Sequence, residues 1–203
     1  MIGYHMAIPY IDSDVHGAVF RTMASAKIRD FLPDNPNRKS IVFAPFNEYI
    51  IIRSSGDIPK ALAKKVTLDV VSGDSITGSV TLSRDLQVMR SKEERMAFEK
   101  QHGRKAKNAE NHEYVKLEGE RLDNYLTKLF TKAGLSDFEY KEGVSTRKHH
   151  LAKRGDTAKP LETMEISFTA KIVDLEAFEN AWLNGIGRYK TYGFGMLRVS
   201  KND

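Results

Sequence analysis

Apolar residues occupy every second position from residue 2 to residue 10, the spacing of a β-strand with one buried face. Three residues that suit a helix N-cap follow, namely Asp12, Ser13 and Asp14. The apolar spacing then becomes helical up to about residue 30, and two prolines, Pro33 and Pro36, end that pattern. The chain is therefore predicted to begin with a strand and a helix.

The next segment predicts a hairpin, a short helix and two more strands. These elements are expected at residues 41–45, 49–54, 58–64, 66–71 and 75–86. The first six elements follow the order β-α-β-β-α-β, which is typical of a ferredoxin-like unit. We expect this unit to occupy residues 1–72.

The remaining residues, 73–203, repeat the same order when residues 75–86 are taken as the first strand. An amphipathic helix is predicted over residues 117–133 with Gly134 at its C-terminus, and a second helix over 175–183 behind the N-cap Asp174. The other strands are expected at residues 138–144, 164–173 and 194–199. The fold class is thus α+β, with two ferredoxin-like (RRM-like) units in tandem and a possible cleft between them for a long polyanion.

Residues 89–112 interrupt this pattern. They are charged, mixed in sign and poor in apolar residues, which is typical of a mobile insertion or linker. A basic arm that becomes ordered on RNA is the alternative interpretation.

The composition of the chain excludes several kinds of chemistry. The chain of 203 residues contains no cysteine, which excludes disulfides, thiol nucleophiles and cysteine-ligated zinc. We find no histidine spacing typical of a metal site, no signal peptide and no apolar run of the ~20 residues that span a bilayer, so a cytoplasmic protein without a cofactor is expected. The net charge of +5 is only weak support for nucleic-acid binding.

The most distinctive segment lies between residues 185 and 195, where four glycines bracket two basic residues and two tyrosines. In order they are Gly185, Gly187, Arg188, Tyr189, Lys190, Tyr192, Gly193 and Gly195. Glycines permit close approach of a ligand to the backbone, and consecutive N–H groups in such a turn can hold a phosphate. A tight connection between helix and strand is the structural alternative.

A second basic segment lies between two predicted strands, so it is expected to form a hairpin over residues 146–159. Its basic residues include Arg147, Lys148, His149, His150, Lys153 and Arg154. They suit contacts with RNA phosphates, although a solvated loop has the same composition. Because adjacent residues of a strand face opposite sides, His149 and His150 are not expected to act together.

The segment from Gly185 to Leu197, G-I-G-R-Y-K-T-Y-G-F-G-M-L, resembles the glycine-rich loop of CRISPR repeat-processing endoribonucleases. The resemblance is to the CasE branch, found in type I-E Cascade complexes, and it extends to the chain length, the tandem fold and residues 114–129. His16, at the start of the first helix, matches the catalytic histidine of that family in position. Where these enzymes often carry a tyrosine one turn earlier, this chain has Ser13; Tyr4 or Tyr10 of the first strand is a candidate replacement.

The resemblance implies a reaction and a set of residues. An RNA 2′-OH attacks the adjacent phosphorus at the base of the repeat hairpin and leaves a 2′,3′-cyclic phosphate and a 5′-OH, without metal or cofactor. His16 is the implied catalytic base, and Arg21 and Lys190 are implied electrostatic helpers. The implied RNA contacts are Lys27, Arg147, Lys148, His149, Lys153, Arg154, Gly185, Gly187, Arg188, Gly193 and Gly195.

The resemblance also implies partners. These are a CRISPR repeat stem-loop and the other subunits of a Cascade-like complex, with no membrane contact and a monomer when free. A non-catalytic RNA-hairpin-binding subunit of the same fold is the alternative, and an unrelated metabolic enzyme on the same fold is a second one.

Overall fold

The computed structural model describes residues 1–9, 41–46, 49–54, 64–105, 111–143, 148–151, 159–190 and 193–202. The predicted helix over residues 15–30 lies outside these ranges, together with His16, Arg21 and Lys27. The same holds for three other predicted contacts, Arg147, Lys153 and Arg154. Among the described helices, none is long and apolar enough to cross a membrane.

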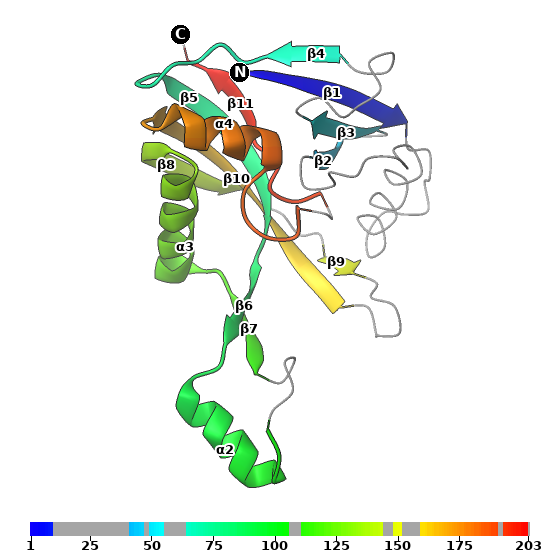
Figure 1. Cartoon of the computed structure of the whole chain (residues 1–203), viewed down its shortest axis with the longest axis vertical. Helices are drawn as coiled ribbons and strands as arrows, with labels where there is room; N and C mark the ends of the chain where they lie inside the picture. Colours follow the sequence, from blue (N-terminus) through cyan, green and yellow to red (C-terminus); the bar gives the residue numbers. More distant parts are fainter. Residues whose placement is uncertain are drawn as a thin grey trace.

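The first sheet is antiparallel and has the strand order β2-β3-β1-β4 (Figure 1). Its strands are β1 (Ile2–Pro9), β2 (Ile41–Phe46), β3 (Tyr49–Ser54) and β4 (Lys64–Thr67). This is the order of a ferredoxin-like sheet, and the predicted hairpin is confirmed. The fourth strand is shorter than predicted, since it ends at Thr67 instead of residue 71, and Lys64 belongs to it rather than to the short helix.

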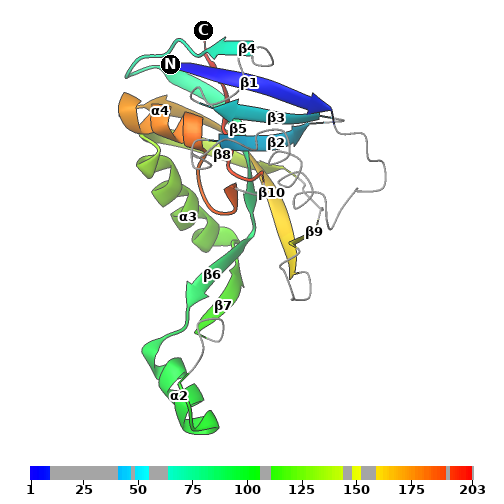
Figure 2. The same cartoon turned by 45° about the vertical axis from the view of Figure 1, so that its right-hand side comes forward.

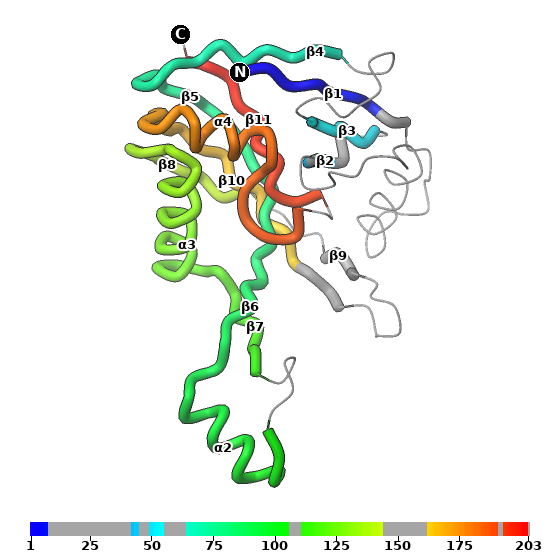
Figure 3. The backbone as a smooth tube through the Cα atoms, viewed as in Figure 1, coloured from blue at the N-terminus to red at the C-terminus, as the bar shows by residue number. Residues whose placement is uncertain are grey.

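The second sheet has the equivalent order β11-β5-β10-β8 and is also antiparallel. Its strands are β5 (Ser75–Ser83), β8 (Leu135–Gly143), β10 (Lys159–Ile172) and β11 (Arg198–Lys201). The predicted helices are present as α3 (Gly119–Lys132) and α4 (Leu175–Asn184). The predicted tandem ferredoxin-like fold is therefore confirmed, and Figure 3 shows that β1 begins and β11 ends at the same end of the molecule.

The core of the second unit lies between its sheet and the two helices. Alternate residues of β10 from Met164 to Ile172 are buried, and α3 contributes three residues spaced by four, Leu122, Leu126 and Phe130. This is the pattern that one buried helix face requires. The Asp174 side chain accepts a hydrogen bond from Ala177 N at 3.0 Å, which caps α4 as predicted.

The described part of the insertion, residues 89–105 and 111–112, consists mainly of regular secondary structure, so the prediction of a mobile linker was wrong for these residues. The predicted strand 75–86 stops at Ser83, and the chain continues as β6 (Asp85–Met89), α2 (Lys92–His102) and β7 (His112–Lys116). We call these three elements the arm; it projects away from both sheets (Figures 1 and 2). Ser91 and Glu94 form a capping box and Gly103 ends α2 in a left-handed conformation, two signals that the charge pattern obscured.

The last strand was also misplaced by the sequence pattern. β11 begins at Arg198, whereas residues 194–197 are not part of a strand although Phe194, Met196 and Leu197 are buried. Their apolar side chains are buried, but their backbone is not part of a strand. The pattern of buried residues therefore resembled that of a strand. They form the second half of the glycine-rich segment.

Candidate nucleic-acid interface

We call residues 185–195 the glycine loop, of which the structure describes 185–190 and 193–195. Ile186 N donates to Gly195 O at 2.8 Å, so the two ends of the loop are hydrogen-bonded to each other. Gly195 N donates to Thr81 O at 2.8 Å, which fastens the loop to β5. The loop is therefore a fixed part of the second unit.

Glycine is required at the ends of this loop for two reasons. Gly185 and Gly195 have φ values of 70° and 79°, which side chains strongly disfavour. A Cβ on Gly195 would also lie 1.9 Å from Ile186 O, and one on Gly185 would lie 2.8 Å from Val42 Cγ2. Since Val42 belongs to β2, the loop packs closely against the first sheet.

The backbone amides predicted to hold phosphate are partly used inside the loop. Gly193 N donates to Lys190 O at 3.0 Å, and the amides of Ile186 and Gly195 are engaged as described above. These three amides therefore help to close the loop, and Arg188 and Lys190 add basic side chains to it. Arg188 is exposed and Lys190 is half-buried.

The exposed part of the glycine loop is attached to the base of the arm. Arg188 Nη1 donates to Gln87 O of β6 at 2.8 Å, and the Tyr189 phenol hydrogen-bonds to that of Tyr114 on β7. Burial, and then the neighbouring Tyr114, raise the pKa of Tyr189. Tyr189 has a φ of 58°, an uncommon conformation for a large side chain, so its contacts with Tyr114 and Phe194 hold a strained backbone in place.

Ion pairs also hold the base of the arm against the second sheet. Lys116 Nζ lies 3.1 Å from Asp85 and 2.6 Å from Glu162, and Arg84 pairs with Glu142 and Glu162. These residues come from β6, β7, β8 and β10 and from the junction between β5 and β6. The arm therefore leaves the second sheet from a rigid base, directly beside the glycine loop.

The predicted basic hairpin exists as β9 (Lys148–Leu151) paired with the first part of β10. Lys148 is opposite Glu162 and His149 is opposite Leu161. His149 and His150 are consecutive residues of a strand, as expected. Of the predicted hairpin contacts, Lys148 and His149 lie within the described residues.

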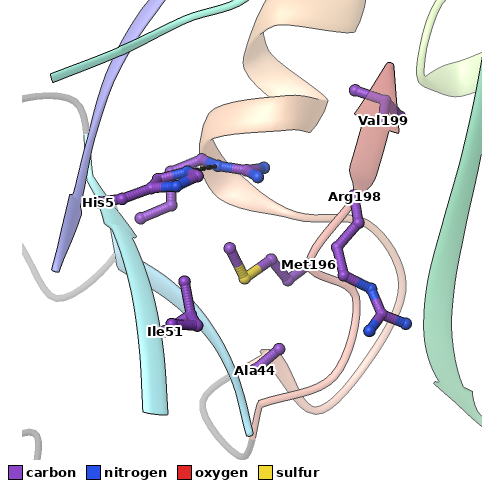
Figure 4. A pocket seen from close by; sticks show the side chains of 7 residues that line it. His5, Ala44, Ile51, Met196, Arg198 and Val199 are labelled. Atoms are coloured by element: carbon purple, nitrogen blue, oxygen red, sulfur yellow. Dashed lines mark hydrogen bonds between the residues drawn. The ribbon is translucent and has the colours of Figure 1, made fainter. Parts of the chain in front are cut away.

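A cavity of about 230 Å³ separates the two sheets (Figure 4). His5, Ala44 and Ile51 face it from the first sheet, while Met196 and Arg198 face it from the second unit (Figure 4). The sequence analysis did not predict this site. It is amphipathic, with an apolar floor and basic groups around it.

Arg53 connects the two sides of this cavity and is only 3% exposed. Its Nη1 donates to Trp182 O at 2.8 Å and to Leu197 O at 2.7 Å, and its guanidinium carbon lies 4.3 Å from the centre of the Trp182 ring. Trp182 is near the C-terminus of α4, where the helix dipole favours a cation. Burial lowers the Arg53 pKa to about 9, so this side chain is still charged at neutral pH.

His5 is the neutral partner of Arg53. Arg53 Nε donates to His5 Nε2 at 2.8 Å, so His5 carries its proton on Nδ1. Burial, and then the charge of Arg53, lower the pKa of His5 to about 4. A lone arginine in the apolar run of β3 was the one sequence signal for this pair.

The His5 pKa predicts a pH-dependent stability. Unfolded His5 binds a proton below about pH 6.5, whereas the folded protein resists protonation of His5 down to about pH 4. The free energy of unfolding is therefore expected to fall as pH decreases from 6.5 to 4. Urea unfolding at several pH values would measure it.

The variant His5→Gln is the control for this prediction, because its amide oxygen can still accept from Arg53. It should show a flatter dependence on pH than the natural protein. Equal slopes for the two proteins would contradict the assignment to His5.

Among the described residues, no cluster of three or more acidic or histidine side chains could hold a metal ion. What the described site offers is a rigid loop with two basic residues, a basic hairpin and an amphipathic cavity between two sheets. The two sheets place the protein in the class of tandem ferredoxin-like α+β proteins.

Comparison with known proteins identifies the family. A family model described as "CRISPR associated protein" matches residues 66–201, about two thirds of the chain. The chain therefore belongs to the family of CRISPR-associated proteins. Comparison of its sequence with curated proteins gave no match.

Several solved structures with a similar fold are CRISPR proteins. Cas6e from Escherichia coli str. K-12 is 16% identical, with a TM-score of 0.59 and coverage of 98% of this chain and 99% of that one. Thermus thermophilus Cse3, bound to an RNA representing a pre-cleavage complex, is 12% identical, with a TM-score of 0.58 and coverage of 98% and 100%. A chain of a CRISPR RNA-guided surveillance complex is 16% identical, with a TM-score of 0.62 and full coverage of both chains.

Proposed function

We propose that this chain is a metal-independent endoribonuclease that cleaves a CRISPR repeat transcript at the base of its hairpin. The observation that carries the proposal is the closed glycine loop, which presents Arg188 and Lys190 on a fold shared with Cse3 bound to RNA. After cleavage the protein keeps the product stem-loop and joins a crRNA-guided complex in the cytoplasm. The match to a chain of a surveillance complex supports this second part.

The proposed reaction uses a nucleophile that the substrate itself supplies. The ribose 2′-oxygen attacks the adjacent phosphorus while the bond from phosphorus to the 5′-oxygen breaks. A base removes the 2′-OH proton, and the leaving 5′-oxygen gains a proton, so the products are a 2′,3′-cyclic phosphate and a 5′-OH. The protein has to align these three atoms and offset the charge that develops on phosphorus.

Each residue has a proposed part in this reaction. His16 is the base, because imidazole titrates near neutral pH. Arg21 and Lys190 offset the developing negative charge. The proposed RNA contacts are Lys27, Arg147, Lys148, His149, Lys153, Arg154 and Arg188, together with the glycines of the loop.

The proposal predicts cleavage in EDTA of a hairpin repeat RNA from the protein's own locus. A substrate with a single 2′-deoxyribose at the cut site should bind equally well and remain intact, because it lacks the nucleophile. Analysis of the product ends for a cyclic phosphate checks the route. Cleavage of the 2′-deoxy substrate, or a strict requirement for added metal, would contradict the mechanism.

A non-catalytic RNA-binding subunit is the second candidate. Ser13 favours it, because it stands where CasE-type enzymes often carry a tyrosine one turn before the histidine. This candidate predicts hairpin binding by the natural protein without cleavage under any of these conditions.

A further inference from the structure

The helix of the arm, α2, is preformed and contributes nothing to the core. None of the residues of α2 is buried, and Met96 is 60% exposed. Isolated helices of 11 residues are marginal in water, yet α2 has a capping box at Ser91 and Glu94 and a left-handed C-cap at Gly103. The sequence therefore stabilises a helix whose surface faces solvent on every side.

The charge of this segment favours a polyanion. Residues 90–105 contain six lysines and arginines against three glutamates. None of the ion pairs between described residues involves Lys92 or Lys100, which lie eight residues apart on a similar side of α2. Neither lysine is therefore held by a carboxylate within the described part of the chain.

The apolar content of the arm argues against a protein partner. Its large exposed apolar side chains are Met89, Met96 and, in part, Tyr114, which are scattered singly. The centre of a stable protein interface is depleted of charge and enriched in packed apolar side chains. Phosphate groups, in contrast, are bound by dispersed lysines and arginines.

The position of the arm connects it to the candidate RNA site. Arg188 of the glycine loop bonds to Gln87 of β6, and Tyr189 bonds to Tyr114 of β7. A strand of five residues and a helix of 11 residues are each ~16 Å long, so the arm reaches ~30 Å from this base. An RNA stem that lies on the glycine loop would be within reach of α2.

We propose that the arm is a second RNA-binding surface, which holds the phosphate backbone of the same repeat hairpin through Lys92 and Lys100. This inference rests on the proposed function, because it assumes that a repeat hairpin occupies the glycine loop. It adds a contact that tightens binding without taking part in the chemical step.

The test uses the full chain and a hairpin repeat RNA with 2′-deoxyribose at the cut site, so that binding is measured without cleavage. The Kd is measured over a range of KCl concentrations for the natural protein and for the double variant Lys92→Gln/Lys100→Gln. Loss of two phosphate contacts should weaken binding about tenfold or more near 0.15 M salt and reduce the salt slope by ~1.5 to 2. The rate of cleavage of an unmodified RNA at saturating protein should not change.

The matched control is Lys132→Gln/Lys171→Gln, which removes the same charge. The C-terminal end of α3 and the start of β5 lie at the end of the body opposite α2 (Figure 1). Lys132 is the last residue of α3, and Lys171 pairs with Ser75 at the start of β5. This control should bind nearly as the natural protein does. Equal Kd values and slopes for the two double variants would overturn the proposal.

A second variant removes α2 and keeps the two strands of the arm. Met89 and His112 are cross-strand partners, so an Asn-Gly turn can replace residues 90–111 and close the hairpin of β6 and β7. This variant should also lose about tenfold or more in affinity while its saturated cleavage rate is retained. Normal RNA binding with a defect only in assembly with other proteins would overturn the proposal and identify the arm as a protein interface.

These outcomes separate the two proposals. If the natural protein neither binds nor cleaves the hairpin, the proposed function and the arm proposal both fail. If it binds and cleaves while the arm variants behave like the control, the arm proposal alone fails.

Discussion

The variant His16→Ala should cleave the repeat hairpin about 10² to 10⁴ times more slowly than the natural protein, at saturating protein and neutral pH. The reason is that a positioned general base contributes a factor of this size to a reaction limited by proton transfer. Single-turnover cleavage measures the chemical step separately from product release. For the natural protein, the cleavage rate is also expected to depend on pH, because the proposed base is an imidazole.

Binding of the 2′-deoxy hairpin is the control for this variant, and it should stay within a few-fold of the natural affinity because His16 is assigned to chemistry. Added imidazole should restore part of the rate, whereas it should not help a variant that is misfolded. Cleavage by His16→Ala at the natural rate would remove His16 from the mechanism.

The variant Gly195→Ala is expected to lose about 3 kcal/mol or more of stability. A left-handed backbone costs a side chain ~1–2 kcal/mol, and overpacking adds ~1–3 kcal/mol. Both costs apply here, because φ is 79° and the new Cβ would lie 1.9 Å from Ile186 O. For a chain of this size the melting temperature should fall by ~10 °C.

The matched control is Gly73→Ala, which has a φ of 97° and no atom within 4 Å of its Cβ position. It should show the backbone cost alone, so its melting temperature should lie clearly above that of Gly195→Ala. Equal melting temperatures would mean that the glycine loop can rearrange, and that its closed form is not needed for folding. Because the loop also holds Arg188 and Lys190, Gly195→Ala should in addition weaken binding of the hairpin RNA.

Local patterns predicted most of the secondary structure. Alternation in β1 and β10 and the apolar face of α3 each follow from a period of 2 or 3.6 residues, which burial on one side of an element imposes. The order of these elements was then enough to predict two ferredoxin-like units, because that order permits few sheet topologies. Asp174 was also predicted correctly as a cap, since its hydrogen bond reaches only three residues along the chain.

The errors have physical causes. The arm was missed because its helix depends on caps instead of an apolar face, and the dense charge masked the capping signal at Ser91 and Glu94. The last strand was misplaced because Phe194 and Leu197 are buried by packing and not by strand pairing. In both cases the hydrophobic pattern and the hydrogen-bond pattern disagree.

For the candidate site, the sequence by itself determined the glycine loop, its basic residues and the basic strand β9. The tertiary structure decided what these residues contact: Arg188 and Tyr189 fasten the loop to the arm, and Gly185 fits against Val42 of the first sheet. It also decided the role of Arg53, whose carbonyl partners lie 129 and 144 residues away along the chain. Contacts over such separations depend on how two sheets pack, and no local period in a sequence records that geometry.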